Sequence, residues 1–392
     1  MIKSLKKYIV VHSGKRDSYK VAEALYDAKQ LGYLVTDDYI FRYHAKKQSS
    51  IPLNHILTSY TAVFWLLMYK LTKKQFCQVN KDKALSTKAV KTANKYQFDL
   101  IAYSYYGLPA FDMLNSTLKK ILFQLHPQPA FIKRLFEEEI RLIPAAEKSL
   151  SQEHELKNND NHFKQLNLEA KKADFVLCAS SFTKYTLEQE NITNTIKVIP
   201  YGVNLSDYPY FERHNTDSKV LQVLFVGSLN QRKGIYYLLE AIEKIQKMDY
   251  DVELTVVGRG IFDKEILDLF SIKKLNLKQN VSFSELIASY KNSDVFVLPS
   301  ICEGFAQVIL EAMATGLPVI STNHTSAPDL ISDGVDGFVI PIRNSDIIVD
   351  KLIYLIEKPA QRLKMGKLAF EKSQQFTWER FSNKLIQCLN EN

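Results

Sequence analysis

The sequence contains little cysteine, and its four cysteines form no CxxC pair. They lie far apart, at Cys77, Cys178, Cys302 and Cys388. This spacing fits a reducing compartment and argues against a disulfide framework or a zinc site. We therefore expect a cytoplasmic protein whose cysteines are neither paired nor metal-bound.

Long apolar runs are also missing, because 18 consecutive apolar residues occur nowhere in the chain. A membrane-spanning helix is therefore not expected. Near the N-terminus, the apolar run from Tyr8 to Val11 is too short for the h-region of a signal peptide and predicts a first β-strand. Internal repeats, low-complexity segments and nucleic-acid-binding motifs are absent as well.

The remaining composition is that of an ordinary globular protein, with 46% hydrophobic and 24% charged residues. A length of 392 residues allows two domains, each with its own core.

Positive charge is concentrated in the first quarter of the chain. Residues 1–100 hold 18 Lys and Arg against seven Asp and Glu, a net charge of +11, whereas the whole chain carries +8. This excess indicates an anionic partner, either a membrane surface or a nucleic acid. A solvated basic face without a partner is the alternative, and charge alone does not decide between the two.

Residues 51–71 form an apolar and aromatic segment that polar residues interrupt and that Lys70, Lys73 and Lys74 flank. The pattern resembles a helix that lies in a membrane interface, with its lysines reaching the headgroups. A helix buried within a domain is the alternative, and helix packing slightly favours it.

Short apolar runs separated by helical patterns predict an α/β fold. In the first half they lie at 8–12, 98–103, 120–125, 174–179 and 196–199; in the second half they lie at 221–226, 252–257, 281–283, 294–298, 317–321 and 337–340. Strands spaced by helices imply parallel sheets covered on both faces. We predict two Rossmann-like, doubly wound domains facing across a cleft. Residues 1–203 form the first, 204–219 a linker, and 220–375 the second, followed by a C-terminal helix over 376–392.

The stretch 294–321 (DVFVLPSICEGFAQVILEAMATGLPVIS) reads as strand, loop, helix and strand. Its helix, from about Phe305 to Thr315, is apolar nearly all round but carries Glu311 in the middle. A buried carboxylate needs a hydrogen-bonding partner. That partner is either a serine or backbone group inside the fold or a pair of ligand hydroxyls, and the helix alone favours neither.

Several other features lie where parallel strands end, which is the ligand edge of such a sheet. Arg232 and Lys233 follow the strand at 221–226, and two cations at a helix entry suit a diphosphate. Gly258, Arg259 and Gly260 follow the next strand, and Gly304 precedes the central helix. Together with Glu311, these residues predict an anionic, hydroxyl-rich ligand such as a nucleotide sugar.

Two positions in the first half also lie at strand ends. His126 follows the run at 120–125, although a lone histidine is more often structural than functional. Gly14 follows the first strand and could let the backbone approach a ligand, but one glycine is no GxGxxG fingerprint.

The segment EGFAQVILEAMATGLPVI resembles the signature of retaining glycosyltransferase family 4, whose fold is called GT-B. The signature has two glutamates separated by seven residues, here Glu303 and Glu311. The resemblance extends to VLFVGSLNQRKGIYYLLEAI, VELTVVGRG, SDVFVLPS and DLISDGVDGFVIP, and it is good from about 169 to 341. In GT-B enzymes a final helix commonly crosses back to the first domain, which is what we expect of 376–392.

The resemblance implies a role for each matching residue. Arg232 and Lys233 would hold the donor diphosphate and stabilise the leaving group, so that no metal or other cofactor is needed. Glu311 would accept hydrogen bonds from the ribose, and Glu303 would contact the donor sugar. The donor-binding set would also include Gly14, Gly258, Arg259 and Gly304, together with the N–H groups of Phe305 and Ala306. His126 would contact donor sugar or acceptor.

The chain departs from the family pattern at several positions. Ser228 stands where the family often has arginine, Ala306 replaces a frequent glycine, and Asp329 replaces a frequent glutamate. The segment after Phe283 (SELIASY) lacks the usual glycine near the nucleobase. The choice among UDP, GDP and ADP therefore stays open.

These observations lead to one main hypothesis and two alternatives. The main hypothesis is a retaining glycosyltransferase that moves a hexosyl-type sugar from a nucleoside-diphosphate sugar to a glycan or lipid-linked acceptor in surface polysaccharide synthesis. It would be cytoplasmic, in possible peripheral contact with an anionic membrane, and would not bind nucleic acid. The alternatives are a nucleotide-sugar epimerase of the same fold and a non-catalytic basic protein that binds membranes or nucleic acid.

Overall fold

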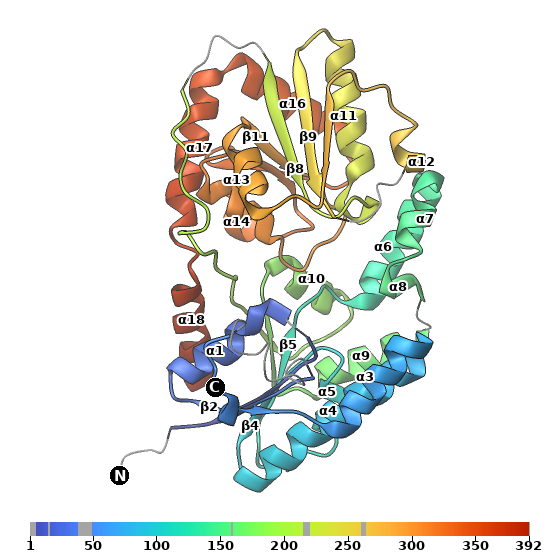
Figure 1. Ribbon diagram of the computed structural model, residues 1–392, viewed down its shortest axis with the longest axis vertical. Helices are drawn as coiled ribbons and strands as arrows, with labels where there is room; N and C mark the ends of the chain where they lie inside the picture. Colours follow the sequence, from blue (N-terminus) through green and yellow to red (C-terminus); the bar gives the residue numbers. More distant parts are fainter. Residues whose placement is uncertain are drawn as a thin grey trace.

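The computed structural model describes residues 5–14, 16–37, 49–157, 160–214, 220–259 and 264–391, with the side chains of 160–163 excepted. Two parallel sheets, each covered by helices, lie one above the other (Figure 1). The lower sheet has the strand order β3-β2-β1-β4-β5-β6-β7 and the upper one β10-β9-β8-β11-β12-β13. The predicted fold class, two doubly wound α/β domains, is confirmed.

The lower, N-terminal domain contains the first seven strands. They are β1 (Tyr8–Val11), β2 (Leu31–Val35), β3 (Ile56–Leu57), β4 (Asp99–Tyr103), β5 (Lys120–Gln124), β6 (Phe175–Cys178) and β7 (Thr195–Val198). Its helices are α1 (Lys20–Asp27), α3 (Tyr60–Thr72), α4 (Gln75–Tyr96), α5 (Gly107–Phe111), α6 (Pro129–Leu142), α7 (Glu147–Leu150), α8 (His154–Lys157), α9 (Asp160–Lys172) and α10 (Ser181–Gln189). Short 3-10 turns are η1 (Arg16–Tyr19), η2 (Leu53–His55) and η3 (Pro144–Ala146).

The upper, C-terminal domain contains the other six strands. They are β8 (Leu221–Val226), β9 (Val252–Gly258), β10 (Leu275–Gln279), β11 (Val295–Leu298), β12 (Val319–Thr322) and β13 (Gly337–Ile340). The 3-10 turn η4 (Gln231–Lys233) leads into α11 (Ile235–Lys247), and α12 (Lys264–Leu267), α13 (Phe283–Lys291), α14 (Gln307–Ala314), α15 (Ala327–Leu330), α16 (Ser345–Glu357) and α17 (Pro359–Ser373) follow. Helix α18 (Trp378–Glu391) ends the described chain.

The central strands consist of apolar residues because both faces of each sheet are covered. β1 (YIVV) and β11 (VFVL) are buried at every position. Side-chain caps then fix where helices begin. Ser180 accepts a hydrogen bond from the N–H of Thr183 at the start of α10, and Ser282 and Glu285 form a capping box at the start of α13.

The two chain crossings between the domains lie side by side. Val203 pairs with Thr377 in an isolated β-bridge, and a Cβ on Gly202 would lie 2.2 Å from the carbonyl carbon of Thr377. Only glycine fits so close to a backbone. Beyond the crossing, α18 packs against the N-terminal domain, where the Tyr8 hydroxyl donates to the Leu389 carbonyl at 3.2 Å.

Residues 204–214 of the predicted linker pack on the C-terminal domain instead of bridging open space. The Arg213 guanidinium donates to three carbonyl oxygens of that domain, those of Tyr290 at 2.8 Å, Ser293 at 3.1 Å and Thr315 at 2.6 Å. Residues 215–219 of the predicted linker lie outside the described residues.

Helix α6 joins the two domains across their interface. Ile132 and Phe136 lie in the same hydrophobic cluster as the C-terminal core. The buried carboxylate of Glu139 pairs with Arg343 at 2.6 Å and accepts from the Gln231 side chain at 2.7 Å. A fully buried carboxylate with these partners holds α6 against the C-terminal domain.

Some predicted elements were wrong. The predicted strand 281–283 is instead the segment that leads into α13, which begins at Phe283. The edge strand is β10, whose residues (LNLKQ) are mostly polar and exposed. β2 and β3 were not predicted. The helix expected within 51–71 begins only at Tyr60, and because Ala62 alone is buried in α3, the alternative of a buried domain helix is wrong.

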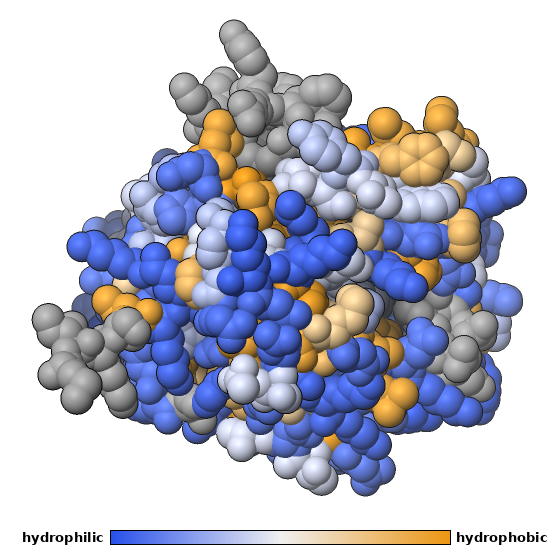
Figure 2. All heavy atoms as spheres, turned by 90° about the horizontal axis from the view of Figure 1, so that it is seen from below, coloured by the Kyte–Doolittle hydropathy of each residue, from blue (hydrophilic) through white to orange (hydrophobic). Residues whose placement is uncertain are grey.

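The end of the molecule formed by the N-terminal domain is largely hydrophilic, with apolar side chains gathered along one upper edge (Figure 2). None of the helices among the described residues combines the length and the apolarity needed to cross a bilayer.

Candidate functional site at the interdomain cleft

Arg232, Lys233 and Glu303 come together at the carboxyl ends of β8 and β11. The Lys233 ammonium lies 2.7 Å from Glu303 Oε1, and Arg232 Nε lies 3.5 Å from the same oxygen. Glu303 is 8% exposed. Two cations therefore converge on one nearly buried carboxylate, and charge-assisted contacts of this kind are the stronger class of hydrogen bonds.

The loop that carries the two cations is held by close backbone contacts. Gly234 has a positive φ of 70°, and a Cβ at this position would lie 1.9 Å from the Pro299 carbonyl oxygen. The N–H of Ile301 donates to the Arg232 carbonyl at 2.9 Å. Glycine at 234 thus lets η4 dock onto the loop after β11, which brings Lys233 to Glu303.

Arg232 also reaches across the cleft to the N-terminal domain. Its Nη1 lies 3.2 Å from a carboxylate oxygen of Glu153, and its Nε donates to the Cys302 carbonyl at 3.1 Å. Burial lowers the pKa of Arg232, but the carboxylates of Glu303 and Glu153 outweigh burial and raise it above its ordinary value. Arg232 is therefore a fixed cation shared by both domains.

Gly304 lies where the loop after β11 packs against the N-terminal domain. A Cβ on Gly304 would lie 2.5 Å from the Leu125 carbonyl oxygen and 3.2 Å from His126 Cα. The Gly304 carbonyl accepts from Ser180 Oγ at 2.5 Å. Gly304 therefore serves as an interdomain contact, and it brings the loop of Glu303 against the end of β5.

A cavity of about 420 Å³ lies within the C-terminal domain, beside the cation pair. It is lined by Tyr208, Val226, Gly227, Ser228, Val257, Gly258, Arg259, Val281, Leu286, Val308 and Glu311. Apolar walls with a few polar groups are typical of sites for small ligands. The structure thus brings Gly258, Arg259 and Glu311 together, whereas Gly260 lies outside the described residues.

Glu311 has an internal partner that the sequence analysis did not name. Its Oε2 accepts from the buried Tyr290 hydroxyl at 2.9 Å. Burial raises the pKa of the Glu311 carboxyl, and hydrogen bonds from the Tyr290 and Tyr208 hydroxyls oppose the rise. Since Glu311 is 9% exposed and lines the cavity, an internal partner and a ligand contact are both compatible with its position.

A second cavity of about 250 Å³ lies in the cleft itself. It is lined by Arg16, Gln78, Lys81, Asp82, Tyr105, Tyr106, His126, Glu153, His154, Glu155 and Arg232. Both domains contribute, because Arg232 belongs to the upper domain and the others to the lower. The mixture of cations, carboxylates and hydroxyl groups suits a polar, hydroxyl-rich ligand.

His126 faces this second cavity as a neutral imidazole. Burial, followed by the positive charges of Arg232 and Arg16, lowers its pKa to about 3. At neutral pH it therefore offers one donor and one acceptor nitrogen to a ligand, without adding charge.

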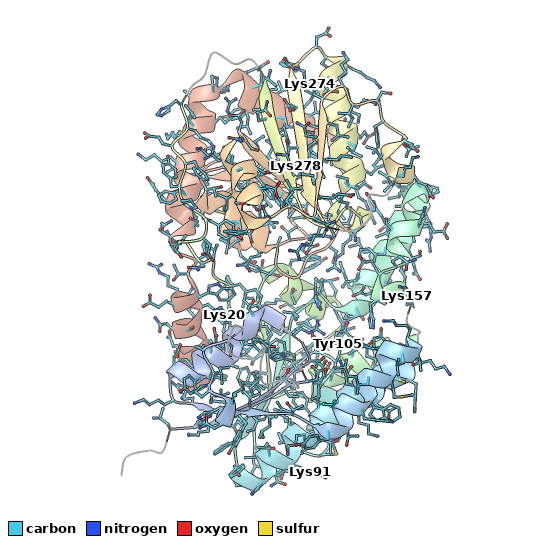
Figure 3. The ribbon with its side chains drawn as sticks, in the orientation of Figure 1. Lys20, Lys91, Tyr105, Lys157, Lys274 and Lys278 are labelled. Carbon is cyan, nitrogen blue, oxygen red and sulfur yellow. The ribbon has the colours of Figure 1, made fainter. Side chains whose placement is uncertain are left out.

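Tyr105 and Glu169 are site features that the sequence analysis missed. Tyr105 has a left-handed backbone with φ of 82° and lies at the top of the N-terminal domain, facing the upper domain (Figure 3). The buried Glu169 carboxylate accepts from the N–H groups of Tyr105 at 3.0 Å and Leu108 at 3.3 Å, and also from that of Gly107. Burial raises the pKa of Glu169 to about 7. This carboxylate shapes the loop after β4, which forms one wall of the second cavity.

Three predicted donor-binding residues lie elsewhere or are already engaged. The Gly14 N–H donates to Asp37 at 3.0 Å, and Gly14 lines neither cavity. The Ala306 N–H donates to Ser326 Oγ at 3.2 Å instead of facing open space. Phe305 packs its ring 5.2 Å from that of Tyr201, between the two cores.

Asp329 takes part in the contact between the domains. Its carboxylate accepts from the Ser181 N–H at the start of α10, at 2.8 Å. Among the described residues, no group of three or more His, Cys, Asp or Glu side chains is arranged to hold a metal ion.

A comparison with known families finds a match over the part of the chain that carries most of this site. Residues 209–372 match the family Glycosyl transferases group 1. This range contains Arg232, Lys233, Glu303 and Glu311, and therefore the whole of the larger cavity except Tyr208.

Similar curated proteins include two bacterial enzymes. The capsular polysaccharide biosynthesis glycosyltransferase CapM of Staphylococcus aureus is 28% identical over 224 residues, which cover 52% of this chain and 59% of CapM. The D-inositol 3-phosphate glycosyltransferase of Pseudarthrobacter chlorophenolicus is 30% identical over 203 residues, 47% of each chain. The chain thus spans about half the length of the curated relatives it matches.

Solved structures resemble the protein over nearly its whole length. Sucrose-phosphate synthase from Thermosynechococcus elongatus has a TM-score of 0.71 and 18% identity, covering 98% of this chain and 99% of its own. The Anabaena HepE protein in complex with UDP-glucose has a TM-score of 0.65 and 17% identity, covering 99% of this chain and all of its own. These likenesses show the fold, which is the GT-B arrangement of two Rossmann-like domains.

Proposed function

We propose that this chain, which carries a glycosyl transferases group 1 domain over residues 209–372, transfers a hexosyl-type sugar from a nucleoside-diphosphate sugar to a glycan or lipid-linked acceptor. The observation that carries the proposal is the Arg232–Lys233–Glu303 cluster. The cations belong to one loop, and Glu303 borders the contact between the domains. The first cavity takes the nucleoside, and the second takes the transferred sugar and its acceptor.

The donor diphosphate lies between these two cavities in our proposal. The stem of Lys233 runs beneath the loop at Gly227, since a Cβ on Gly227 would be 3.6 Å from Lys233 Cε. Gly227 lines the first cavity and Arg232 the second, so the Arg232–Lys233 pair has one member beside each cavity. The two cations neutralise the leaving diphosphate without requiring a metal.

We infer transfer with retention of anomeric configuration. The bond between the anomeric carbon and the β-phosphate oxygen breaks, and the acceptor oxygen forms its bond on the same face. The acceptor proton passes to the leaving phosphate oxygen. Glu303 holds donor-sugar hydroxyls, and neutral His126 donates to or accepts from sugar hydroxyls without competing for that proton. The anomeric signals of the product in a proton NMR spectrum test this inference.

The acceptor is a precursor in surface polysaccharide or glycoconjugate synthesis, at the cytoplasmic face of a membrane. The capsular polysaccharide enzyme among the similar proteins supports this assignment. All four cysteines are thiols, which fits a reducing compartment.

The test of donor binding is a thermal-shift panel of UDP-, GDP- and ADP-sugars. A ligand that binds only the folded state stabilises it by about 2.7 kcal/mol at 100 times its Kd. We expect one nucleotide series to raise the Tm by several degrees. If no member of the panel moves the Tm, the proposal is wrong. Product analysis with and without acceptor then separates transfer from epimerisation, because an epimerase alters the sugar without an acceptor.

Replacing Glu311 by alanine is expected to raise the Kd of the best nucleotide about 10- to 100-fold, because a charge-assisted hydrogen bond contributes roughly 1.5–3 kcal/mol. Isothermal titration with the nucleoside diphosphate alone measures the change. The matched control is Glu357→Ala, a surface glutamate that contacts Tyr250 at 2.7 Å and lies outside both cavities. Equal affinities in the wild type and Glu311→Ala would show that Glu311 does not contact the nucleotide and only accepts the hydrogen bond from Tyr290.

A further inference from the structure

The outer surface of α3 is apolar, although it faces solvent. Tyr60, Phe64, Leu67 and Leu71 occupy positions i, i+4, i+7 and i+11, so they form one stripe along the helix. Tyr60 is 92% and Leu71 80% exposed, and the other two are more than half exposed. Such a contiguous exposed stripe marks an interaction site rather than a scattering of single residues.

Helix α4 carries both an extension of this stripe and a basic groove. Phe76 and Val79 are exposed apolar residues near the start of α4. Farther along, Lys83, Lys88 and Lys91 line a groove of about 380 Å³ between α3 and α4, and Trp65, Ser59 and Thr61 form its α3 side. Figure 3 shows Lys91 near the end of the N-terminal domain that lies away from the cleft.

We propose that this α3–α4 surface, the stripe together with the lysine groove, binds an anionic phospholipid membrane, with headgroup phosphates in the groove. The three ammonium groups neutralise phosphate, and the hydroxyl groups of Ser59 and Thr61 donate to its oxygens. The indole of Trp65 suits the boundary between headgroup and acyl chain. The stripe inserts into the apolar edge of that boundary.

The charge of the two helices selects this occupant over others. Residues 60–96 hold eight lysines and one acidic residue, Asp82. A second copy of the chain, paired through the same patch, would bring like charges together. An anionic leaflet instead offers opposite charge to the groove lysines Lys83, Lys88 and Lys91.

The position of α4 connects this surface to the reaction. Helix α4 packs between α3 and the sheet, and its residues Gln78, Lys81 and Asp82 line the cleft cavity. A membrane on the α3–α4 surface would therefore lie beside the cleft, where a lipid-linked acceptor must enter. This step rests on the proposed function, whereas membrane binding itself does not.

The test is co-sedimentation with vesicles, without donor or acceptor. We expect the wild type to bind vesicles containing about one-third phosphatidylglycerol and to leave pure phosphatidylcholine vesicles largely unbound. Lys83→Gln/Lys88→Gln/Lys91→Gln should weaken binding about 100-fold, at roughly fivefold per lysine. The control Lys273→Gln/Lys364→Gln/Lys367→Gln removes three exposed lysines of the C-terminal domain and should change binding less than threefold.

A second variant separates the stripe from the groove. Phe64→Ser/Leu71→Ser should weaken binding at every salt concentration, because apolar burial is not screened, whereas the lysine effect should fade as salt rises. Unchanged melting temperatures check that these surface variants fold.

The proposal is overturned if the wild type stays in the supernatant with anionic vesicles or if replacing the control lysines weakens binding as much as replacing the groove lysines. It is also overturned if ultracentrifugation shows that the wild type is a dimer and the only effect of Phe64→Ser/Leu71→Ser is to dissociate it. Since no sugar is present, failure here leaves the proposed transfer intact, and failure of the donor panel leaves this result intact.

Discussion

Replacing Lys233 by alanine is expected to lower kcat/KM for glycosyl transfer about 100- to 1000-fold. Removing one preplaced group that stabilises developing charge typically costs about that much, roughly 2.7–4 kcal/mol. Lys233 qualifies because it is largely buried, lies 2.7 Å from Glu303, and has its Cε 3.6 Å from where a Cβ on Gly227 would be, a residue that lines the first cavity. The assay measures the release of nucleoside diphosphate and the glycosylated product together.

The matched control for this change is Lys247→Ala. Lys247 ends helix α11, the helix that begins just after Lys233, and it also pairs with a glutamate, Glu243, at 2.8 Å. It is exposed and lines neither cavity, so turnover should stay within about twofold, as expected of a surface ion pair. Lys233→Arg restores the charge and should recover part of the activity. If Lys233→Ala turns over substrate at a rate close to that of the wild type, Lys233 does not stabilise the leaving group.

The same assay tests whether transfer requires a divalent metal ion. If Arg232 and Lys233 supply the positive charge, turnover should be equal with and without EDTA. A loss of activity in EDTA that added divalent cation reverses would show that the two cations do not suffice.

The upper half of the molecule could be predicted largely from the sequence. Its strands are continuous apolar runs that end in distinctive loops, so both the positions of Arg232 and Lys233 and the strand before Glu303 followed from local patterns. The edge strand β10 could not be predicted, because an edge strand exposed on one side needs few apolar residues. Its sequence LNLKQ carries little pattern.

The cleft wall of the lower half could not be predicted, because its residues act through contacts between distant segments. Glu169 accepts from the N–H of Tyr105, 64 positions away, and Glu153 meets Arg232 across the domain interface. Glu153 lies in no periodic pattern or motif, and Glu169 only begins the segment EAKKADFVLCASSF, whose resemblance to the family assigns it no role. A buried charge can be inferred from sequence where the surrounding helix is apolar, as at Glu311, but not in the polar surroundings of these two residues.

The second large effect is expected for Gly304→Ala. This substitution should impair closure of the two domains while leaving donor binding intact. A methyl group at 304 would lie 2.5 Å from the Leu125 carbonyl oxygen and 3.3 Å from Pro127 Cδ. The first distance is to backbone, which cannot rotate away, so we expect Gly304→Ala to push the loop after β11 and the N-terminal domain apart by about 1 Å. A misplacement of this size can lower turnover about 100-fold.

The affinity for the nucleotide should survive the Gly304→Ala change. The cavity that contains Glu311 is formed by the C-terminal domain and residue Tyr208, which packs on it, so separation of the domains leaves it whole. We expect the Kd of the nucleoside diphosphate to stay within about threefold while kcat falls.

Two controls decide whether closure is the cause of the Gly304→Ala effect. Ser180→Ala removes the hydrogen bond to the Gly304 carbonyl without adding bulk, and it should lower kcat by no more than about tenfold. Gly334→Ala adds a methyl group where nothing lies within 4 Å but φ is +75°, so backbone strain of about 1–2 kcal/mol should lower the Tm with turnover unchanged. If Gly304→Ala lowers the Tm in the same way and keeps its turnover, the contact at Gly304 is structural. If it loses turnover at an unchanged nucleotide affinity, the two domains must meet at Gly304 for the sugar to move.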